Sequence, residues 1–430
     1  MEENNKKSKL NEEQINRSGT PASVSRGRLF IQFLCLCMGS TLIYYVPYHM
    51  KNYYNLVLEA LKINNTQFGM LGTVYGLTTL ITYLPGGWMA DRFSARKLLS
   101  LSYIMSGLLQ LYFLTFPPFA VCIPLYFLMG IFATLTFWPA MIKATRQFAK
   151  AGSEGKTFGG LEAGHGVVAF GLGTVMTVVF AATGAGLFSL RLNVLVYAIL
   201  CFIMGTLTFV TFSDSPAEKT NKIGFSNVKE GLSHPSVWMI SFIVFGIYSA
   251  SLATGYMNAL FTNSFGTSMM FAVIVGQIRS YFRPVGAYAG GIISDRIGKA
   301  KTMLIFTVTL MAAYGIICLV PPEPSFIYPV AGISCLITII TALTWGQSYA
   351  LMSEGNVPMY LTGIAVGIIS TIGFIGDSFF PLMVGIIFDR YPGITGHRIM
   401  FGIGIGFGLQ AVIMLLIFMK VNRNRITPPV

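Results

Sequence analysis

The chain has 430 residues, of which 54% are hydrophobic and only 10% are charged, and its formal net charge is +13. A soluble protein typically carries about 25% charged residues, so the composition argues against a soluble enzyme. Apolar runs of roughly 20 residues recur along the chain, and each is long enough to cross a ~30 Å hydrocarbon core. The runs lack the strict alternation of barrel strands, which favours transmembrane helices.

We therefore predict an all-α membrane protein with twelve transmembrane helices in two six-helix bundles. In chain order, the predicted spans cover residues 28–50, 66–90, 97–116, 119–147, 157–183, 188–212, 236–262, 269–294, 300–320, 325–352, 360–388 and 398–420. The predicted divisions are a disordered cytoplasmic tail, an N-terminal bundle, a cytoplasmic linker, a C-terminal bundle and a second cytoplasmic tail, at 1–26, 27–212, 213–235, 236–420 and 421–430.

The positions of the basic residues predict orientation rather than a nucleic-acid partner. Most of the 29 Lys and Arg residues fall in alternate loops on the side of the N-terminus. The other side is predicted to hold Lys51, Lys62, Arg191, Arg390 and Arg398. Because cytoplasmic loops are enriched in Lys and Arg, we expect both termini to be cytoplasmic. The expected location is the plasma membrane, or the inner membrane of a bacterium.

The six cysteines all lie within apolar spans and form no Cys-x-x-Cys pair. We therefore expect no disulfide, no metal site and no cofactor. The chain also lacks a Walker A pattern, a His-Glu-x-x-His pair and a Gly-x-Ser-x-Gly elbow. These absences argue against an ATP-driven pump and against an enzyme.

One short pattern occurs twice. The stretch Gly86–Arg92 (GGWMADR) recurs as Gly290–Arg296 (GGIISDR), and each copy ends an apolar run before a basic turn. The copies follow the second and eighth predicted spans, so the repeat unit is six helices. Duplicated helical bundles of this kind are usually secondary transporters.

The charged residues of the two copies are predicted to act as gating latches. Asp91 and Asp295 can accept hydrogen bonds from N–H groups at the start of an adjacent helix, where the helix dipole is positive. Arg92, Arg96 and Arg296 can bridge to carboxylates or carbonyl groups across the turn. Such contacts can hold one face of a transporter shut and release it during the cycle.

The doubled pattern, together with twelve spans and a long central loop, resembles the signature of the major facilitator superfamily. The resemblance covers about residues 28–420 and implies alternating access, in which the two bundles rock about a site near mid-membrane.

A narrower resemblance points to the anion-handling branches of that superfamily, the organophosphate:phosphate antiporters and the anion:cation symporters. Trp138-Pro139 precedes Lys143 as a Trp-Pro precedes a cation in the first branch, and His165 matches a histidine that helps to bind phosphate there. The eighth span carries Arg283, much as the nitrate transporters carry an arginine in their eighth helix.

A charged side chain near the membrane centre costs free energy, so we expect each one to have a functional or structural role. Arg279 and Arg283 are four residues apart, so they share one face of a helix. Arg283 is expected roughly 18 Å from Asp295, near the membrane centre. Two guanidinium groups on one face suit a carboxylate, phosphate or sulfonate. The alternative is that one or both pair with buried acids.

Three further groups are candidates. Asp377 is the most embedded acid, and we expect either a proton-coupling group or the structural partner of Arg279. Glu162 and His165 share a helix face and, with Lys143, can bind an anion or relay a proton. The alternative for Lys143 and Glu162 is an ion pair that only closes a helix interface.

Aromatic residues in the first, fourth, seventh and tenth spans suit the walls of a cavity for an organic solute, because the resemblance places those helices around the site. The candidates are Tyr44, Tyr48, Trp138, Tyr248 and Trp345. Core packing and interfacial belts are the alternative for each of them.

We therefore expect a monomeric secondary transporter that moves a small organic anion across the lipid bilayer, coupled to protons or to exchange. The alternative within transport is a proton-coupled carrier of a neutral or cationic solute. Outside transport, the alternative is a membrane sensor that binds its ligand without moving it.

Overall fold

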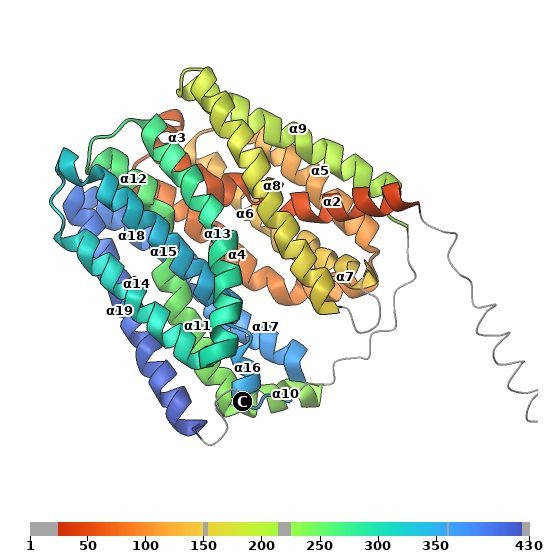
Figure 1. Ribbon diagram of the computed structural model, residues 1–430. Coiled ribbons are helices and arrows are strands. Elements are labelled where there is room, and N and C mark those ends of the chain that lie inside the picture. Colours follow the sequence, from red (N-terminus) through yellow and green to blue (C-terminus); the bar gives the residue numbers. More distant parts are fainter. Residues whose placement is uncertain (1–24, 149–153, 214–224, 359–360, 424–430) are drawn as a thin grey trace, which may run out of the picture.

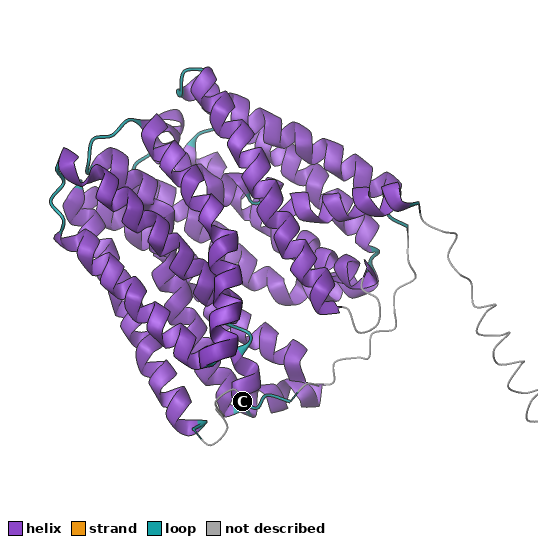
Figure 2. Cartoon of the chain, in the orientation of Figure 1, coloured by secondary structure: helices purple, strands orange, loops and turns teal. Residues whose placement is uncertain are grey.

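The computed structural model describes residues 25–148, 154–213, 225–358 and 361–423, apart from a few side chains that include those of Asp91 and Glu162. Every regular element in these ranges is helical, as Figure 2 shows. In Figure 1 the helices of residues 26–211 lie mainly toward the upper right, and those of residues 235–421 lie mainly toward the lower left. The predicted fold class is confirmed.

The helices of the first group are α2 (Arg26–Leu42), η1 (Tyr45–His49), η2 (Met50–Tyr53), α3 (Tyr54–Leu61), α4 (Asn65–Arg92), α5 (Ala95–Phe113), α6 (Phe119–Ile131), η3 (Phe132–Phe137), α7 (Trp138–Phe148), α8 (Glu154–Ala182) and α9 (Leu187–Thr211). Those of the second are α11 (Pro235–Ser251), η4 (Leu252–Tyr256), α12 (Met257–Asn263), α13 (Met269–Ile297), α14 (Lys299–Leu319), η5 (Pro324–Phe326), α15 (Ile327–Gln347), α16 (Leu351–Glu354), α17 (Thr362–Gly373), η7 (Ile375–Ser378), α18 (Phe380–Arg390) and α19 (Ile394–Val421). The predicted linker contains α10 (Phe225–Ser233) and, at 214–224, residues outside the description.

Within the described ranges, 9 helical segments are long and apolar enough to cross a membrane. The remaining predicted spans correspond to α4, α5 and α13, of which α4 and α13 carry the two signature copies. The predicted end of the first span at residue 50 is wrong, because that segment runs from Arg26 to Leu61 over 36 residues. Its backbone passes through π-helical and 3-10 turns without leaving the helical path.

Within the described residues, four spans change helix type partway along. The changes are at η1 with η2, η3, η4 and η7, in the first, fourth, seventh and eleventh spans. Pro47 lies within η1 and Gly376 within η7. π-helical and 3-10 turns change which backbone groups pair with each other, and neighbouring protein satisfies any group left without a partner in a membrane. We therefore expect these turns to face the protein interior. The Tyr314 hydroxyl, for example, donates to the Ala250 carbonyl just before η4 at 2.9 Å.

The two signature copies lie at one end of the molecule, which we call the basic end because Arg92, Arg96 and Lys299 lie there. The end where α4 begins, at Asn65, is called the opposite end. Among the described residues, the two bundles are joined by hydrogen bonds in the middle of the molecule and at the opposite end. There the Asn55 amide donates to the Asn263 side chain at 2.6 Å.

The two glycines of each signature copy have different surroundings. A Cβ added at Gly86 would lie 2.5 Å from the Thr134 carbonyl oxygen, and one at Gly290 would lie 2.8 Å from the Leu343 carbonyl oxygen. A Cβ added at Gly87 or Gly291 would meet nothing within 4 Å. The first glycine of each pair therefore permits close helix packing within its bundle, whereas the second, four residues before the aspartate, does not.

This difference gives a test of the packing. We expect Gly86→Ala and Gly290→Ala to lower the melting temperature of the purified protein by several degrees, because the added methyl group collides with backbone. The neighbouring Gly87→Ala and Gly291→Ala serve as matched controls and should leave it unchanged or raise it, since alanine favours a helix by about 1 kcal/mol. Equal effects at both positions of a pair would contradict the packing.

Candidate functional site

A cavity of about 390 Å³ lies between the first span and the second bundle. Its volume is within the range of small-molecule sites. Four elements of the second bundle, α11, η4, α13 and α15, face η1 and η2 of the first across it. The lining residues are Tyr48, Lys51, Tyr248, Ser251, Leu252, Thr254, Gly255, Arg283, Thr338, Thr341, Ala342 and Trp345.

Asp377 lies beside this cavity at the break between α17 and α18, and its side chain is buried. The Tyr48 hydroxyl donates to Asp377 Oδ2 at 3.1 Å, and the Tyr248 hydroxyl donates to the same oxygen at 2.5 Å. The two tyrosines belong to different bundles. One carboxylate therefore ties the bundles together through two phenols.

Lys51 extends along the same wall. Its ammonium lies 5.8 Å from the centre of the Tyr48 ring and 5.2 Å from that of the Tyr256 ring. Both distances are within the range of cation–π attraction. The prediction that placed Lys51 in a loop is wrong, because the residue lies inside the elongated first span and lines the cavity.

The two predicted arginines of α13 lie in different places. Arg283 lines the cavity. Arg279 is buried, and it donates to the Thr254 carbonyl at 3.3 Å and to the Asn258 side-chain oxygen at 2.8 Å. Its described hydrogen bonds are thus to neutral groups of η4 and α12, not to Asp377. Arg279 braces the turn that forms one cavity wall.

The structure does not bring Lys143 to the described cavity lining. Its ammonium donates to the Ala90 carbonyl at the C-terminal end of α4, where the helix dipole attracts a cation. His165 lies half-buried on α8, next to Gly166, whose added Cβ would lie 3.6 Å from Pro284 of α13. The Glu162 side chain lies outside the described part, so its predicted proton-carrying role stays a prediction.

Three of the five aromatic candidates line the cavity. Tyr48, Tyr248 and Trp345 do so, and the Tyr248 and Trp345 ring centres lie 5.4 Å apart. Tyr44 is outside the described lining, and its ring centre lies 6.0 Å from that of Tyr48. Trp138 begins α7 and packs against the hydrophobic core.

Arg92 and Arg96 of the first signature copy each have a contact within the first bundle. The Arg92 guanidinium stacks 4.2 Å from the Trp88 ring centre, and Arg96 donates to the Phe209 carbonyl at 2.6 Å. Asp295 and Arg296 are exposed at the end of α13. The Asp91 side chain lies outside the described part, so the predicted latch at that residue stays a prediction.

We did not predict that Lys51 or the hydroxyl groups of Ser251, Thr254, Thr338 and Thr341 would line the cavity. A signal for Lys51 was present, because Leu56, Val57 and Leu58 continue the apolar pattern beyond it. Hydroxyl residues are common in membrane helices, where they also bond to their own backbone. No pattern in the sequence singles out those that face a cavity.

The fold and this interior cavity define a multi-pass membrane carrier for a small molecule. The chain belongs to the Major Facilitator Superfamily, whose family model matches residues 28–381. It is not an enzyme.

Two relatives from Escherichia coli (strain K12) carry names that give a location. The inner membrane protein YqcE is 27% identical over 84% of this chain and 87% of its own length. The inner membrane protein YihN is 25% identical over 91% of this chain and 95% of its own. In both cases the sequence similarity extends over most of this chain.

Two solved structures share the fold. A bacterial homologue of the human lysosomal transporter Spinster, in an inward-facing and unoccupied conformation, aligns with a TM-score of 0.73 and 15% identity over 94% of this chain and 100% of that one. The nucleoside transporter NupG aligns with a TM-score of 0.70 and 15% identity over 93% of this chain and 100% of that one.

The bracing role of Arg279 can be tested by stability. A lysine side chain at position 279 cannot reach both the Thr254 carbonyl and the Asn258 side-chain oxygen. We therefore expect Arg279→Lys to reduce the free energy of unfolding by about 1–3 kcal/mol and to lower the melting temperature. Arg296→Lys, on the exposed end of the same helix, is the control and should leave the melting temperature unchanged. A melting temperature for Arg279→Lys equal to that of the control would show that the two bonds do not brace the wall.

Proposed function

We propose that this chain carries a small organic anion across the inner membrane by alternating access. One observation supports the charge of the cargo most directly. Lys51 of the first bundle and Arg283 of the second both line a single interior cavity of about 390 Å³. Cations from both bundles allow an anion to contact both halves of the carrier at once.

The shape of the lining narrows the chemical class. A guanidinium group offers a planar pair of donors that fits a carboxylate, sulfonate or phosphate. The Tyr248 and Trp345 rings provide an apolar wall, and the hydroxyls of Thr338 and Thr341 provide hydrogen-bonding groups. We infer a cargo with one acidic head and a body that is partly apolar and partly hydroxylated. This chemistry agrees with the resemblance to the anion-handling branches.

A carrier of a neutral, hydroxylated solute is the second candidate. The observation in its favour is that Tyr48 lies next to both Asp377 and Lys51, because its hydroxyl donates to Asp377 and its ring centre lies 5.8 Å from the Lys51 ammonium. If Asp377 neutralises Lys51, the cavity offers mainly hydroxyl and aromatic groups. The two candidates differ in the role of Lys51 and Arg283, which contact the cargo only in the anion carrier. The first experiment below therefore removes these two charges.

The remaining parts of the proposal concern orientation and coupling. The basic end is proposed to face the cytoplasm, with both chain termini there, by the distribution of Lys and Arg. Asp377 is proposed as a proton-coupling group because it is a buried acid that joins the two bundles. Glu162 is the second candidate for that role. The active form is proposed to be a monomer that needs only its substrate and the bilayer.

The cargo charge is tested by uptake into proteoliposomes with Arg283→Gln and Lys51→Gln. We expect each change to reduce uptake of organic anions at least tenfold, because the cation that contacts the acidic head is lost. Lys62→Gln, at a surface position outside the cavity, is the control. Anion uptake that is unchanged in both cavity variants would contradict the proposed contacts of Lys51 and Arg283 with the cargo. Uptake of a neutral hydroxylated solute, but not of organic anions, by the unaltered protein would favour the second candidate, and ligand binding without flux would indicate a sensor.

Coupling is tested with Asp377→Asn. An amide cannot take up or release the proton, so we expect uptake to lose its stimulation by an imposed pH gradient. Exchange of internal for external substrate at equal pH should persist, since it needs no net proton movement. Glu323→Gln, in the loop between α14 and α15, is the control for removal of a carboxylate. An Asp377→Asn carrier that still responds fully to the gradient would exclude Asp377 as the coupling group.

A further inference from the structure

The signature pattern has a third copy at the other end of the molecule. Gly385–Arg390 (GIIFDR) repeats the Gly-x-x-x-Asp-Arg spacing of Gly87–Arg92 and Gly291–Arg296. It forms the C-terminal end of α18, which lies beside the start of α4 at the opposite end. The first two copies lie at the basic end.

Asp389 of this third copy holds the first turn of α4 in the other bundle. Its Oδ1 accepts hydrogen bonds from the Asn65 backbone N–H at 3.1 Å and from the Asn65 side-chain amide at 2.7 Å. Its Oδ2 accepts from the Thr66 backbone N–H at 2.7 Å and from the Thr66 hydroxyl at 2.5 Å. A carboxylate at this position also benefits from the positive end of the helix dipole.

The backbone N–H groups at the start of α4 donate to acceptors from two places, the helix's own cap and Asp389 of the other bundle. Asn64 and Gln67 satisfy each other in a capping box, with bonds of 3.0 and 2.8 Å. The Asn65 and Thr66 N–H groups have no partner within their helix, and Asp389 supplies one for each. Separation of the bundles would therefore expose two N–H groups to water while α4 keeps its own cap.

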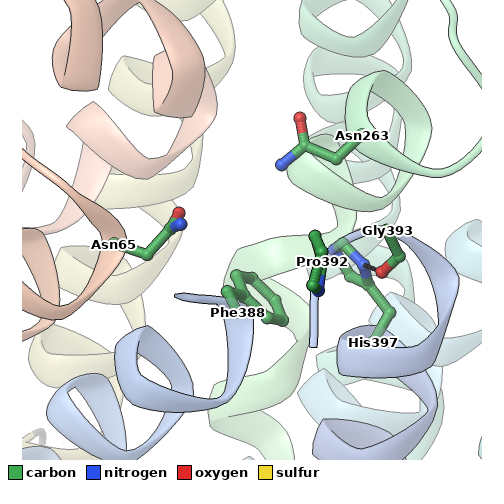
Figure 3. Close-up of a pocket in the computed structure, with 6 residues that line it drawn as sticks. All are labelled: Asn65, Asn263, Phe388, Pro392, Gly393 and His397. Carbon is green, nitrogen blue, oxygen red and sulfur yellow. Dashed lines mark hydrogen bonds between the residues drawn. The ribbon is translucent and has the colours of Figure 1, made fainter. Parts of the chain in front are cut away.

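The glycine of the third copy permits the contact. A Cβ added at Gly385 would lie 2.3 Å from the Asn65 carbonyl oxygen, so only glycine lets α18 approach this closely. Beside the contact, Figure 3 shows Asn65 across a pocket of about 280 Å³ from Asn263 and Phe388 of the second bundle. The interface is thus partly open and polar around the Asp389 contact, which suits a contact that can separate.

We propose that Gly385–Arg390 is a latch that holds the opposite end of the carrier closed and releases when that end opens. It uses the chemistry predicted for the two copies at the basic end, but it acts in the other half of the cycle. Asp389 is the positioning residue of this latch. Asn65 and Thr66 are its receptor on the first bundle.

The chain contains a matched contact that does not cross between bundles. Glu354 of α16 accepts from the backbone N–H groups of Lys299 at 2.6 Å and Ala300 at 3.0 Å, at the start of α14. Both elements belong to the second bundle. Glu354→Gln therefore removes the same carboxylate-on-helix contact without touching the interface between the bundles.

The test measures the distance between spin labels at Glu59→Cys and Glu323→Cys, two exposed positions at the opposite end on different bundles. The full-length protein without these two changes, treated with the same label, gives the background from native cysteines. We expect Asp389→Asn to increase the ratio of long to short distances at least tenfold. Glu354→Gln should lower the melting temperature but leave the distance distribution unchanged.

A milder variant keeps the test decisive where Asp389→Asn fails to fold. Thr66→Val preserves shape and removes only the hydroxyl donor, and we expect a smaller shift in the same direction. Distances that stay unchanged in every folded latch variant would overturn the proposal. So would an equal shift in Glu354→Gln, because the effect would then follow from the loss of any helix cap.

Discussion

A lipid bilayer offers no hydrogen bonds to a polypeptide backbone, and this constraint decides where the molecule can be irregular. Each span must satisfy its own N–H and C=O groups, so a break in a helix must be enclosed by protein or face water. The breaks of the first, seventh and eleventh spans contribute Lys51, the η4 turn and Asp377 to the same region. The side chains with chemistry thus gather where the backbone is protected from lipid.

The same region contains the charges that must respond when the bundles move. Asp377 accepts one phenol from each bundle, so a motion that separates the bundles there must break or rearrange the bond to Tyr48. Lys51 lies on the first bundle and Arg283 on the second, and both face the cavity. A bound molecule changes the balance between two conformations only through a difference in its affinity for them. Groups on both sides of the moving interface are the ones that can create such a difference.

The sequence was sufficient for the architecture because hydropathy, length and the repeated GG-x-x-x-DR pattern act over whole helices. It also selected Arg283, Tyr48, Tyr248 and Trp345, which the structure brings to one cavity. The sequence did not predict side-chain positions that depend on how a helix is rotated about its axis or on a break within a helix. Lys51 looked like the end of a span, because a cation after about 20 apolar residues is usually at the membrane surface.

Arg279 and Lys143 show a second limit of the sequence. Both bond to neutral oxygen atoms, those of Thr254 and Asn258 for Arg279 and that of Ala90 for Lys143. Every residue has a carbonyl, so no pattern of side chains predicts which one a buried cation will choose. The third signature copy was missed for a related reason, since a lone Asp-Arg pair at the end of a span resembles an ordinary charged boundary.

Two carboxylates make similar contacts with helix starts, but only one of these contacts must break when the bundles move apart. Glu354 and Asp389 both cap the start of a helix, but the first acts within a bundle and the second between bundles. A hydrogen bond of this kind contributes about 0.5–1.5 kcal/mol net, and somewhat more when one partner is charged. The bonds of Asp389 are exposed to water, which replaces them at little cost when they break. Their sum is therefore at most a few kcal/mol, which does not exceed the differential binding energy that moves a two-state equilibrium. A carrier needs such a balance, because a much stronger contact would trap one conformation and a much weaker one would leave the opposite end open.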